Sequence, residues 1–486
     1  MNIEPIGRRR VVAGLAAFLA APALVRAEVL RPMPRGGVRP EGLAEILARS
    51  GLADRTGFAL MELTSGRIVE SHNPAMARPP ASVAKVVTAA YAMDRLGAGY
   101  AFATRIRATG PIEAGALRGD LVLEGGGDPL LDTDALGDMA AALAARGVQT
   151  VAGRFLVETG ALPSLREIDP GQPEFAGYNP AISGMNLNFN RAHLEWEPGG
   201  GGPKAAFLAP GLRFNAEVPS IRADLSGAGA PRHAVVEGGE VWSVDARTMS
   251  GRGGRWLPVR DPGPYAGAVF RSLALRQGVR MPEPEAVAAA GPGAILVERE
   301  SDGLDVVLRG MLRYSTNLTA EVVGLRSAQA AEGDPAGLAA SGADMTVWAR
   351  DRFGLDGADF VNHSGLTDRT RVTATEMTRL LAGAEDVLGG LLRERPLLDA
   401  RREAVEIGGA RVFAKTGTLH FTSALGGYLE GPRGRYAFAI MAADMEGRGR
   451  VDPRSEARPA GARRFAGRAR SQEQALLRRW ASLHAA

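Results

Sequence analysis

A helix predicted from Pro79 to about Leu96 constrains the fold of this chain more than any other stretch. Pro79 and Pro80 give the helix a stiff entry, and Gly97 gives it an end. Its apolar side chains recur at helical spacing and form one stripe. Because such a stripe has to be covered, we expect the helix to lie inside a domain. The stripe consists of Val83, Val86, Val87, Ala90 and Met93.

The same helix carries one of only three lysines in the chain. Of the 58 basic residues, all but Lys85, Lys204 and Lys415 are arginine. Arginine stays protonated at any working pH, whereas a buried lysine can lose its proton and act as a base. Lys85 and Lys415 both lie in short patterns that need such an ammonium group. This selective use of lysine indicates chemistry rather than surface charge.

The length and charge of the chain limit its class. A chain of 486 residues is too long for one compact core, which favours two or three domains. Its net charge of +4 falls close to neutral once the basic N-terminus is set aside, so we expect no nucleic acid partner. Since the chain has no cysteine, it has no disulfide, thiol nucleophile or thiolate metal site.

Residues 1–27 have the pattern of an export signal. Three arginines at 8–10 precede an apolar run over 11–25, and a small-residue cleavage pattern ends at Ala27. The run is short for a membrane span, so we expect cleavage and no stable span in the mature form. The protein is therefore predicted to be periplasmic. The pattern leaves both the general and the twin-arginine export routes open.

The order of the remaining elements predicts an α/β (α+β) fold, with an antiparallel sheet flanked by helices and a large insertion. One domain is expected from 28–99 and 298–445, and 100–297 forms a mostly β insertion. Residues 446–470 are rich in Arg, Gly and Pro and are predicted to be flexible. A C-terminal helix follows over 471–486.

Individual elements can also be predicted from the periodicity. The expected helices cover 42–49, 134–146, 306–326 with a break at 314–317, 344–353 and 373–388. The expected strands cover 56–63, 67–70, 411–415, 424–430 and 436–442.

Ser82-Val83-Ala84-Lys85 is the first of three patterns that carry chemistry. Three residues apart on a helix, Ser82 and Lys85 project from the same face. The amine then lies within reach of a hydroxyl that is a poor nucleophile by itself. If Lys85 is desolvated and close to a second cation, its pKa falls and it can take the proton of Ser82. Free N–H groups at a helix N-terminus also suit a developing oxyanion.

The other two patterns are Ser315-Thr316-Asn317 and Lys415-Thr416-Gly417-Thr418. Ser315 can relay a proton to a leaving amine, and Asn317 can hold a substrate carbonyl. Lys415 and Thr416 offer a cation and a hydroxyl for a terminal carboxylate. Gly417, at the end of a strand, lets a substrate backbone approach closely.

Each pattern alone is weak, but together and in this order they match the motifs of active-site serine penicillin-recognising enzymes. From about Phe58 to about Asp444 the chain resembles the D-alanyl-D-alanine carboxypeptidase/endopeptidases of the penicillin-binding protein 4 type, the low-molecular-mass class C penicillin-binding proteins. More than two hundred residues separate Ser82 from Ser315, and this family carries an insertion of that size. Further matching segments are Arg78 to Ser82, Gly125 to Pro129 and Ser183 to Asn188. Near Ser364-Gly365-Leu366, Asn362 and His363 replace an Asp and a Gly of the family pattern.

The resemblance implies a β-lactamase/transpeptidase-like fold and a serine DD-peptidase that acts on the D-Ala-D-Ala terminus or the cross-links of peptidoglycan. It assigns catalysis to Ser82, Lys85, Ser315, Asn317 and Lys415 and substrate binding to Thr416, Gly417 and Thr418. The N–H groups of Ser82 and Thr418 would form the oxyanion hole. Peptidoglycan peptides are the expected substrates and β-lactams the expected covalent inhibitors. No metal or cofactor is implied.

Two other functions remain open at this point. A β-lactamase or esterase on the same fold would need a group that activates water for deacylation. A non-catalytic cell-wall-binding protein would have no use for the Ser82 and Lys85 pair. A Ser-His-Asp hydrolase and a zinc peptidase are disfavoured, because the chain has neither Gly-x-Ser-x-Gly nor His-Glu-x-x-His. The balance of carboxypeptidase and endopeptidase activity is open as well.

Overall fold

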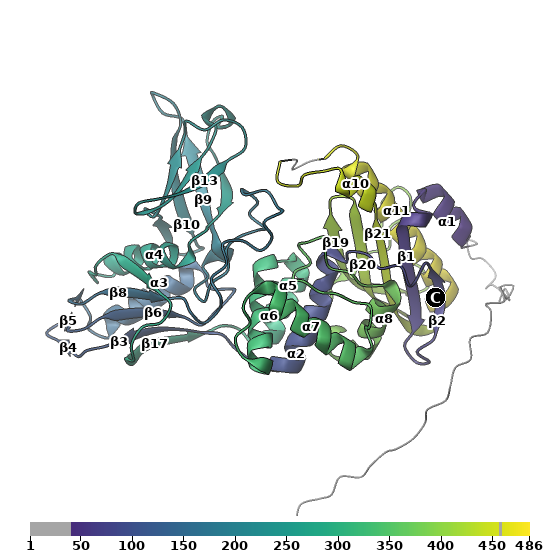
Figure 1. Ribbon diagram of the computed structural model, residues 1–486, viewed down its shortest axis with the longest axis horizontal. Coiled ribbons are helices and arrows are strands. Elements are labelled where there is room, and N and C mark those ends of the chain that lie inside the picture. The colour runs from purple at the N-terminus through teal and green to yellow at the C-terminus, as the bar shows by residue number, and fades with distance from the viewer. Residues whose placement is uncertain (1–39, 456–458) are drawn as a thin grey trace, which may run out of the picture. The chain divides into compact units, whose positions relative to one another are not determined.

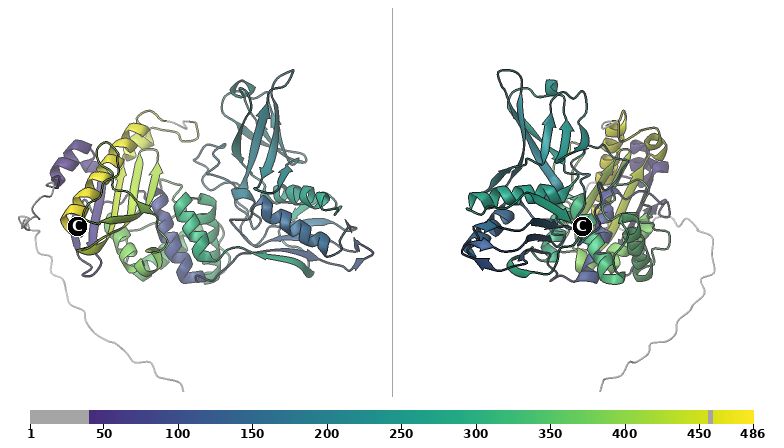
Figure 2. Two further views of the ribbon diagram at one scale, coloured as in Figure 1. Left: turned by 180° about the vertical axis from the view of Figure 1, so that it is seen from behind. Right: turned by 60° about the vertical axis from the view of Figure 1, so that its left-hand side comes forward.

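The structure is a computed structural model that describes residues 40–455 and 459–486 (Figures 1 and 2). The predicted export signal, 1–27, lies outside these residues. Among the helices that are described, none is both long enough and apolar enough to cross a membrane.

A six-stranded sheet forms the centre of the α/β part, in the order β18-β19-β20-β21-β1-β2. Each neighbouring pair is antiparallel. Strands from both ends of the chain meet in it, since β1 pairs along its whole length with β21 (Figure 1). The strands are β1 (Thr56–Glu62), β2 (Ile68–His72), β18 (Glu394–Arg395), β19 (Arg411–Leu419), β20 (Thr422–Gly431) and β21 (Gly434–Ala443).

Helices cover both faces of this sheet, which confirms the predicted fold class. In β1, Ala59 faces the core shared with α2, α5, α6, α7 and α8, whereas Phe58 and Leu60 face the core shared with α1 and α11. The small side chain on the first face lets the helices approach the sheet closely. These helices are α1 (Leu43–Ser50), α2 (Ala84–Leu96), α5 (Leu304–Tyr314), α6 (Asn317–Glu332), α7 (Leu338–Phe353), α8 (Ala374–Gly383), α9 (Glu385–Leu388), α10 (Met445–Gly449) and α11 (Ala462–Trp480).

The helix that begins after Pro79 and Pro80 is buried as predicted. A 3₁₀ turn over Ala81–Val83 leads into α2, and Val83, Val86 and Val87 are at most 1% exposed. The break expected at 314–317 also exists, between α5 and α6.

The strand expected to end at Lys415 continues to Leu419. Thr416-Gly417-Thr418 looks like a turn in the sequence, but β20 pairs with β19 residue by residue from Arg411 to Leu419. The reversal lies instead at His420 and Phe421, where Phe421 has a φ of 58°. Pairing with a neighbouring strand therefore overrides the local preference.

The C-terminal helix begins at Ala462 rather than at 471, and α10 also lies largely within the segment 446–470 predicted to be flexible. Phe465 and Ala469 pack in a small core with Leu52 and Ala442. In the sequence, Phe465 and Ala469 stand among arginines, and the residues that they contact lie far away in the chain. The periodicity therefore did not reveal the start of this helix.

The region between β3 and β17 contains four further sheets and two helices. A five-stranded sheet runs in the order β16-β8-β6-β3-β17. Its first and last strands in the chain, β3 and β17, pair with each other. The predicted boundaries 28–99, 100–297 and 298–445 stay predictions, but this pairing supports an insertion that leaves and rejoins the main domain at neighbouring points.

The elements of this region are β3 (Ala103–Ala108), β4 (Ile112–Glu113), β5 (Ala116–Leu117), β6 (Leu121–Gly125), α3 (Thr133–Ala145), β7 (Thr150–Val151), β8 (Phe155–Glu158), β9 (Arg191–Glu197), β10 (Lys204–Pro210), β11 (Asn215–Glu217), β12 (Ile221–Asp224), β13 (Arg232–Val236), β14 (Gly239–Ser243), β15 (Gly253–Pro258), α4 (Pro262–Arg276), β16 (Pro284–Val287) and β17 (Ala294–Glu300). Residues 125–129 form the end of β6 and lead into a turn.

Candidate active site

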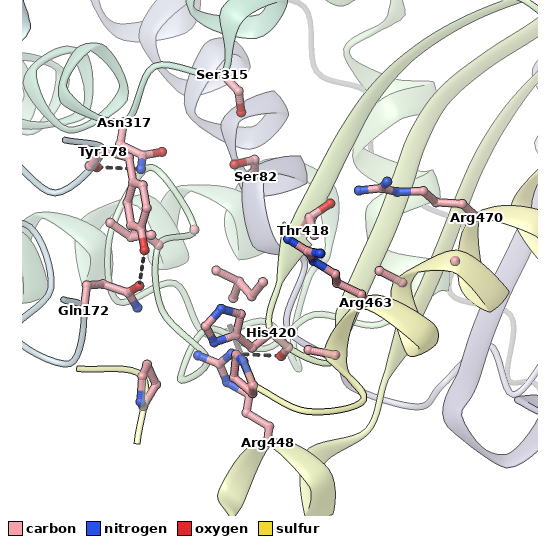
Figure 3. A pocket seen from close by; sticks show the side chains of 18 of the residues that line it. Ser82, Gln172, Tyr178, Ser315, Asn317, Thr418, His420, Arg448, Arg463 and Arg470 are labelled. Atoms are coloured by element: carbon pink, nitrogen blue, oxygen red, sulfur yellow. Dashed lines mark hydrogen bonds between the residues drawn. The ribbon is translucent and has the colours of Figure 1, made fainter. Parts of the chain in front are cut away.

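The fold brings the three sequence patterns together at one cavity of about 710 Å³. Ser82 comes from the turn before α2, Ser315 and Asn317 from the junction of α5 and α6, and Thr418 from β19; all four line the cavity (Figure 3). Lys85 and Lys415 lie behind this lining and are buried.

Lys85 connects the first pattern to the second. Its Nζ donates to Ser82 Oγ at 3.1 Å, to Asn317 Oδ1 at 2.8 Å and to the carbonyl oxygen of Ser364 at 2.7 Å. Burial lowers the pKa of Lys85 well below its usual 10.5, and the nearby charge of Lys415 lowers it further, while Glu321 opposes this shift. The predicted cause, desolvation beside a second cation, is therefore present. Lys85 is placed to accept a proton from Ser82.

The segment from Asn362 to Gly365 holds Lys85 through its backbone. Ser364 supplies a carbonyl acceptor to Lys85. The N–H groups of His363 and Ser364 each donate to Glu321 at 2.9 Å, and that of Gly365 donates to Asn362 Oδ1 at 3.0 Å. Asn362 thus stabilises the turn by the hydrogen bond that an aspartate at the same place can also accept.

His363 is a packing residue. Its ring stacks against Tyr91, Nε2 lies 2.7 Å from Ser341 Oγ, and burial lowers its pKa to about 3, so the ring is neutral. Gly324 provides the space, because a Cβ at this position would overlap the imidazole. The histidine that departs from the family pattern therefore has a glycine opposite it.

Lys415 connects the third pattern to the second. Its Nζ donates to Ser315 Oγ at 2.9 Å and to the carbonyl of Thr416 at 2.6 Å. Burial, with a smaller contribution from the charge of Arg395, lowers the pKa of Lys415 to about 7. Ser315 reaches it from the end of α5 with a φ of 60°, a left-handed conformation that few non-glycine residues adopt.

Gly417 allows the turn of Ser82 to lie directly against β19. A Cβ on Gly417 would lie 2.6 Å from the carbonyl oxygen of Pro80 and 3.0 Å from the nitrogen of Ser82. The sequence suggested that this glycine makes room for a substrate backbone; in the structure the room is filled by Pro80 and Ser82. The neighbouring residue, Thr416, has its Oγ1 3.5 Å from Arg395 Nη2.

Several residues at the cavity were not identified from the sequence. Asn317 Nδ2 donates to the carbonyl of Tyr178 at 2.9 Å, and the Tyr178 hydroxyl donates to Gln172 Oε1 at 3.3 Å. Glu321 and the Ser364 carbonyl, which surround Lys85, were also missed. The lining further includes His420 and arginines at 402, 448, 463 and 470. For Arg448, Arg463 and Arg470 the only signal was the density of arginine in 446–470.

The described residues offer no cluster of three His, Asp or Glu side chains of the kind that holds a metal ion. The groups gathered around Ser82 are hydroxyls, amines and an amide, which suit acyl transfer with proton relay.

Comparison with known proteins agrees with this chemistry. The profile of the D-Ala-D-Ala carboxypeptidase 3 (S13) family matches residues 40–460. A D-alanyl-D-alanine carboxypeptidase of Actinomadura sp. (strain R39) is 28% identical over 433 residues, which cover 79% of this chain and 77% of that protein.

Solved structures show the same fold. Penicillin binding protein 4 (dacB) of Haemophilus influenzae has a TM-score of 0.68 at 20% identity, over 82% of this chain and 92% of that one. Its complex with a β-lactam has a TM-score of 0.64 at 19% identity, over 81% and 92% of the two chains. Since the family profile spans most of the sequence, this chain belongs to the D-Ala-D-Ala carboxypeptidase family.

Proposed function

We propose that this protein is an exported, periplasmic serine DD-peptidase that hydrolyses the D-Ala-D-Ala terminus or the peptide cross-links of peptidoglycan through an acyl-enzyme on Ser82. The observation that carries the proposal is the contact of 3.1 Å between Ser82 Oγ and a fully buried Lys85. A buried amine with a lowered pKa next to a hydroxyl is the arrangement that makes serine nucleophilic.

Acylation begins when neutral Lys85 takes the proton of Ser82. Ser82 Oγ then forms a bond to the carbonyl carbon of the substrate, and the carbonyl oxygen becomes an oxyanion. The N–H groups of Ser82 and Thr418 are the proposed donors to that oxyanion. Asn317, held by Lys85 on one side and by the Tyr178 carbonyl on the other, is in a fixed orientation to hold a substrate amide.

Collapse of the tetrahedral intermediate breaks the peptide bond, and the leaving amine needs a proton. Ser315 is the proposed relay, because its hydroxyl lies 2.9 Å from Lys415 Nζ; it gives its proton to the amine and regains the one that Lys85 took from Ser82, so Lys85 is neutral again. Water then attacks the ester on Ser82, with Lys85 taking one of its protons, and Lys85 returns that proton to Ser82 Oγ as the acyl portion leaves.

Substrate binding is proposed along β19. Lys415, Thr416 and Thr418 are the candidates for holding the terminal carboxylate, with Gly417 bringing this strand against Ser82. The short strand β18 pairs with β19 at Val412 and Phe413, and Ala414 N–H donates to the Arg393 carbonyl, so the edge from Lys415 onward is proposed to take a substrate backbone. A β-lactam that opens on Ser82 would remain as a covalent inhibitor.

The test is release of D-alanine from a synthetic peptide that ends in D-Ala-D-Ala. The unmodified protein should release it, and Ser82→Ala should not. Folding of the variant is checked by thermal unfolding. Hydrolysis that persists in a well-folded Ser82→Ala protein would contradict the proposal.

A further inference from the structure

The wall of the cavity opposite Tyr178 and Asn317 is formed by one face of α11. Arg463, Ala466, Gly467 and Arg470 all line the cavity and follow the spacing that places residues on one side of a helix. Figure 3 shows Arg463 and Arg470 extending from α11 toward Thr418. Between them, small side chains leave room, since a Cβ at Gly467 would meet nothing within 4 Å.

These two guanidinium groups lack an ion-pair partner in the described part of the chain. Neither forms an ion pair with a described Asp or Glu, and no described residue that lines the cavity is acidic. Arg448 is different, because Asp368 binds its Nε at 2.6 Å and the His420 carbonyl binds its Nη1 at 3.0 Å. The cavity thus contains both a paired arginine and unpaired ones.

Glu473, the carboxyl that interacts electrostatically with Arg470, is only partly charged near neutral pH. The Glu473 side chain is buried and accepts a hydrogen bond from Ser423 Oγ at 2.7 Å. Burial raises its pKa to about 7, and the charge of Arg470 lowers it only in part. The first turn of α11 carries no acidic residue and no side-chain cap, so its free N–H groups add to the positive potential. This wall is suited to an anion that is not part of the protein.

We infer that Arg463 and Arg470 form a second anion subsite, which binds a carboxylate of the leaving peptide beyond the one next to the scissile bond. The inference rests on the proposed function, in which Lys415, Thr416 and Thr418 hold the first carboxylate. The leaving portion then continues past Thr418 toward α11, whereas Tyr178 and Gln172 lie on the acyl side. Two arginines seven residues apart span about 10 Å along the helix, which fits an extended peptide.

The chemical consequence is a preference among leaving groups. Free D-alanine has a single carboxylate and leaves the subsite empty. The leaving half of a cross-linked peptide carries further carboxylates, which can form charge-assisted hydrogen bonds with guanidinium groups. The subsite therefore favours endopeptidase over carboxypeptidase turnover.

The test uses a synthetic cross-linked peptide dimer and the same dimer with the distal carboxylate of its leaving peptide converted to a carboxamide. We expect kcat/KM of the unmodified protein to be about tenfold higher for the carboxylate dimer, mainly through KM. In the double variant Arg463→Gln/Arg470→Gln this ratio should fall to near one. Arg464→Gln is the matched control, because Arg464 is exposed on the same helix but does not line the cavity, and it should keep the ratio.

A double variant that keeps the full ratio, or an Arg464→Gln variant that loses it equally, would overturn the inference. Failure of the proposed function would look different, because the unmodified protein would then cleave neither dimer and would not be acylated at Ser82 by penicillin. A protein that is acylated but does not distinguish the two dimers counts against the subsite alone.

Discussion

Lys85 and Lys415 lie in the same site, yet the protein surrounds them differently. Lys85 has three hydrogen-bond acceptors, Ser82, Asn317 and the Ser364 carbonyl, and the carboxyl group of Glu321 opposes the lowering of its pKa. Lys415 contacts Ser315 and the Thr416 carbonyl, and its charged neighbour is the cation of Arg395. Burial is the main cause of the lowered pKa in both.

The difference indicates two roles for one residue type. Lys85 touches the proposed nucleophile, so its lowered pKa serves proton abstraction. Lys415 contacts Ser315 but not Ser82, so its N–H group orients the proposed relay and its protonated form attracts a carboxylate; with a pKa of about 7, that form is partly populated near neutral pH. The following substitutions test this contrast.

Arginine in place of each lysine should separate the roles most strongly. Lys85→Arg keeps the charge but cannot accept a proton, so acylation by penicillin should slow by about 10³-fold. Lys415→Arg keeps the cation that attracts the carboxylate, and we expect a loss of about tenfold. Stopped-flow acylation rates measure both. Equal losses in the two variants would show that the contrast is not functional.

Lys415→Met should change how stability depends on pH. Because the pKa of folded Lys415, about 7, lies below the 10.5 of an exposed lysine, the folded state binds fewer protons than the unfolded state between these values. Stability therefore rises with pH across this window, by up to about 1.4 kcal/mol per pH unit from this group. Denaturant unfolding at several pH values should show a shallower rise in the variant. An unchanged slope would mean that Lys415 is not desolvated.

Glu321→Gln should destabilise the turn at His363 and Ser364 that supplies a carbonyl acceptor to Lys85. Glu321 accepts the N–H groups of His363 and Ser364, and a glutamine has only one acceptor oxygen for them. We expect a loss of about 1–3 kcal/mol in the free energy of unfolding. Since Glu321 raises the pKa of Lys85, its removal should also move the acid limb of the acylation rate to lower pH. A shift to higher pH would contradict the assigned direction.

Arg395→Gln should have the smallest effect. Arg395 contributes less than burial to the lowered pKa of Lys415, so its removal should raise that pKa slightly. A protonated Lys415 then persists to higher pH, and KM for a D-Ala-D-Ala peptide should begin to increase at a higher pH than in the unmodified protein. A shift in the opposite direction would mean that Arg395 acts on the substrate rather than on Lys415.

The same contrast explains what the sequence can and cannot predict. Ser82 and Lys85 were predictable because a rare residue type stands at helical spacing, and Ser315, Asn317 and Lys415 because short motifs keep their order. The acceptor that the Ser364 backbone provides has no residue-type signal, and Glu321 looks like any other helical glutamate.

The α11 wall was missed for a different reason. The sequence between 446 and 470 is dominated by arginine, and helix formation there depends on Phe465 and Ala469 packing with Leu52, more than four hundred residues away. Such contacts between the ends of a chain leave no local pattern. The extension of β19 through Gly417 depends likewise on pairing with β20.

The most direct measurement is covalent labelling of the purified protein by a fluorescent penicillin, beside the Ser82→Ala variant, with the labelled peptide identified by mass spectrometry. The account predicts labelling at Ser82 in the unmodified protein and none in the variant. A well-folded protein that stays unlabelled, or a label on another residue, would contradict it.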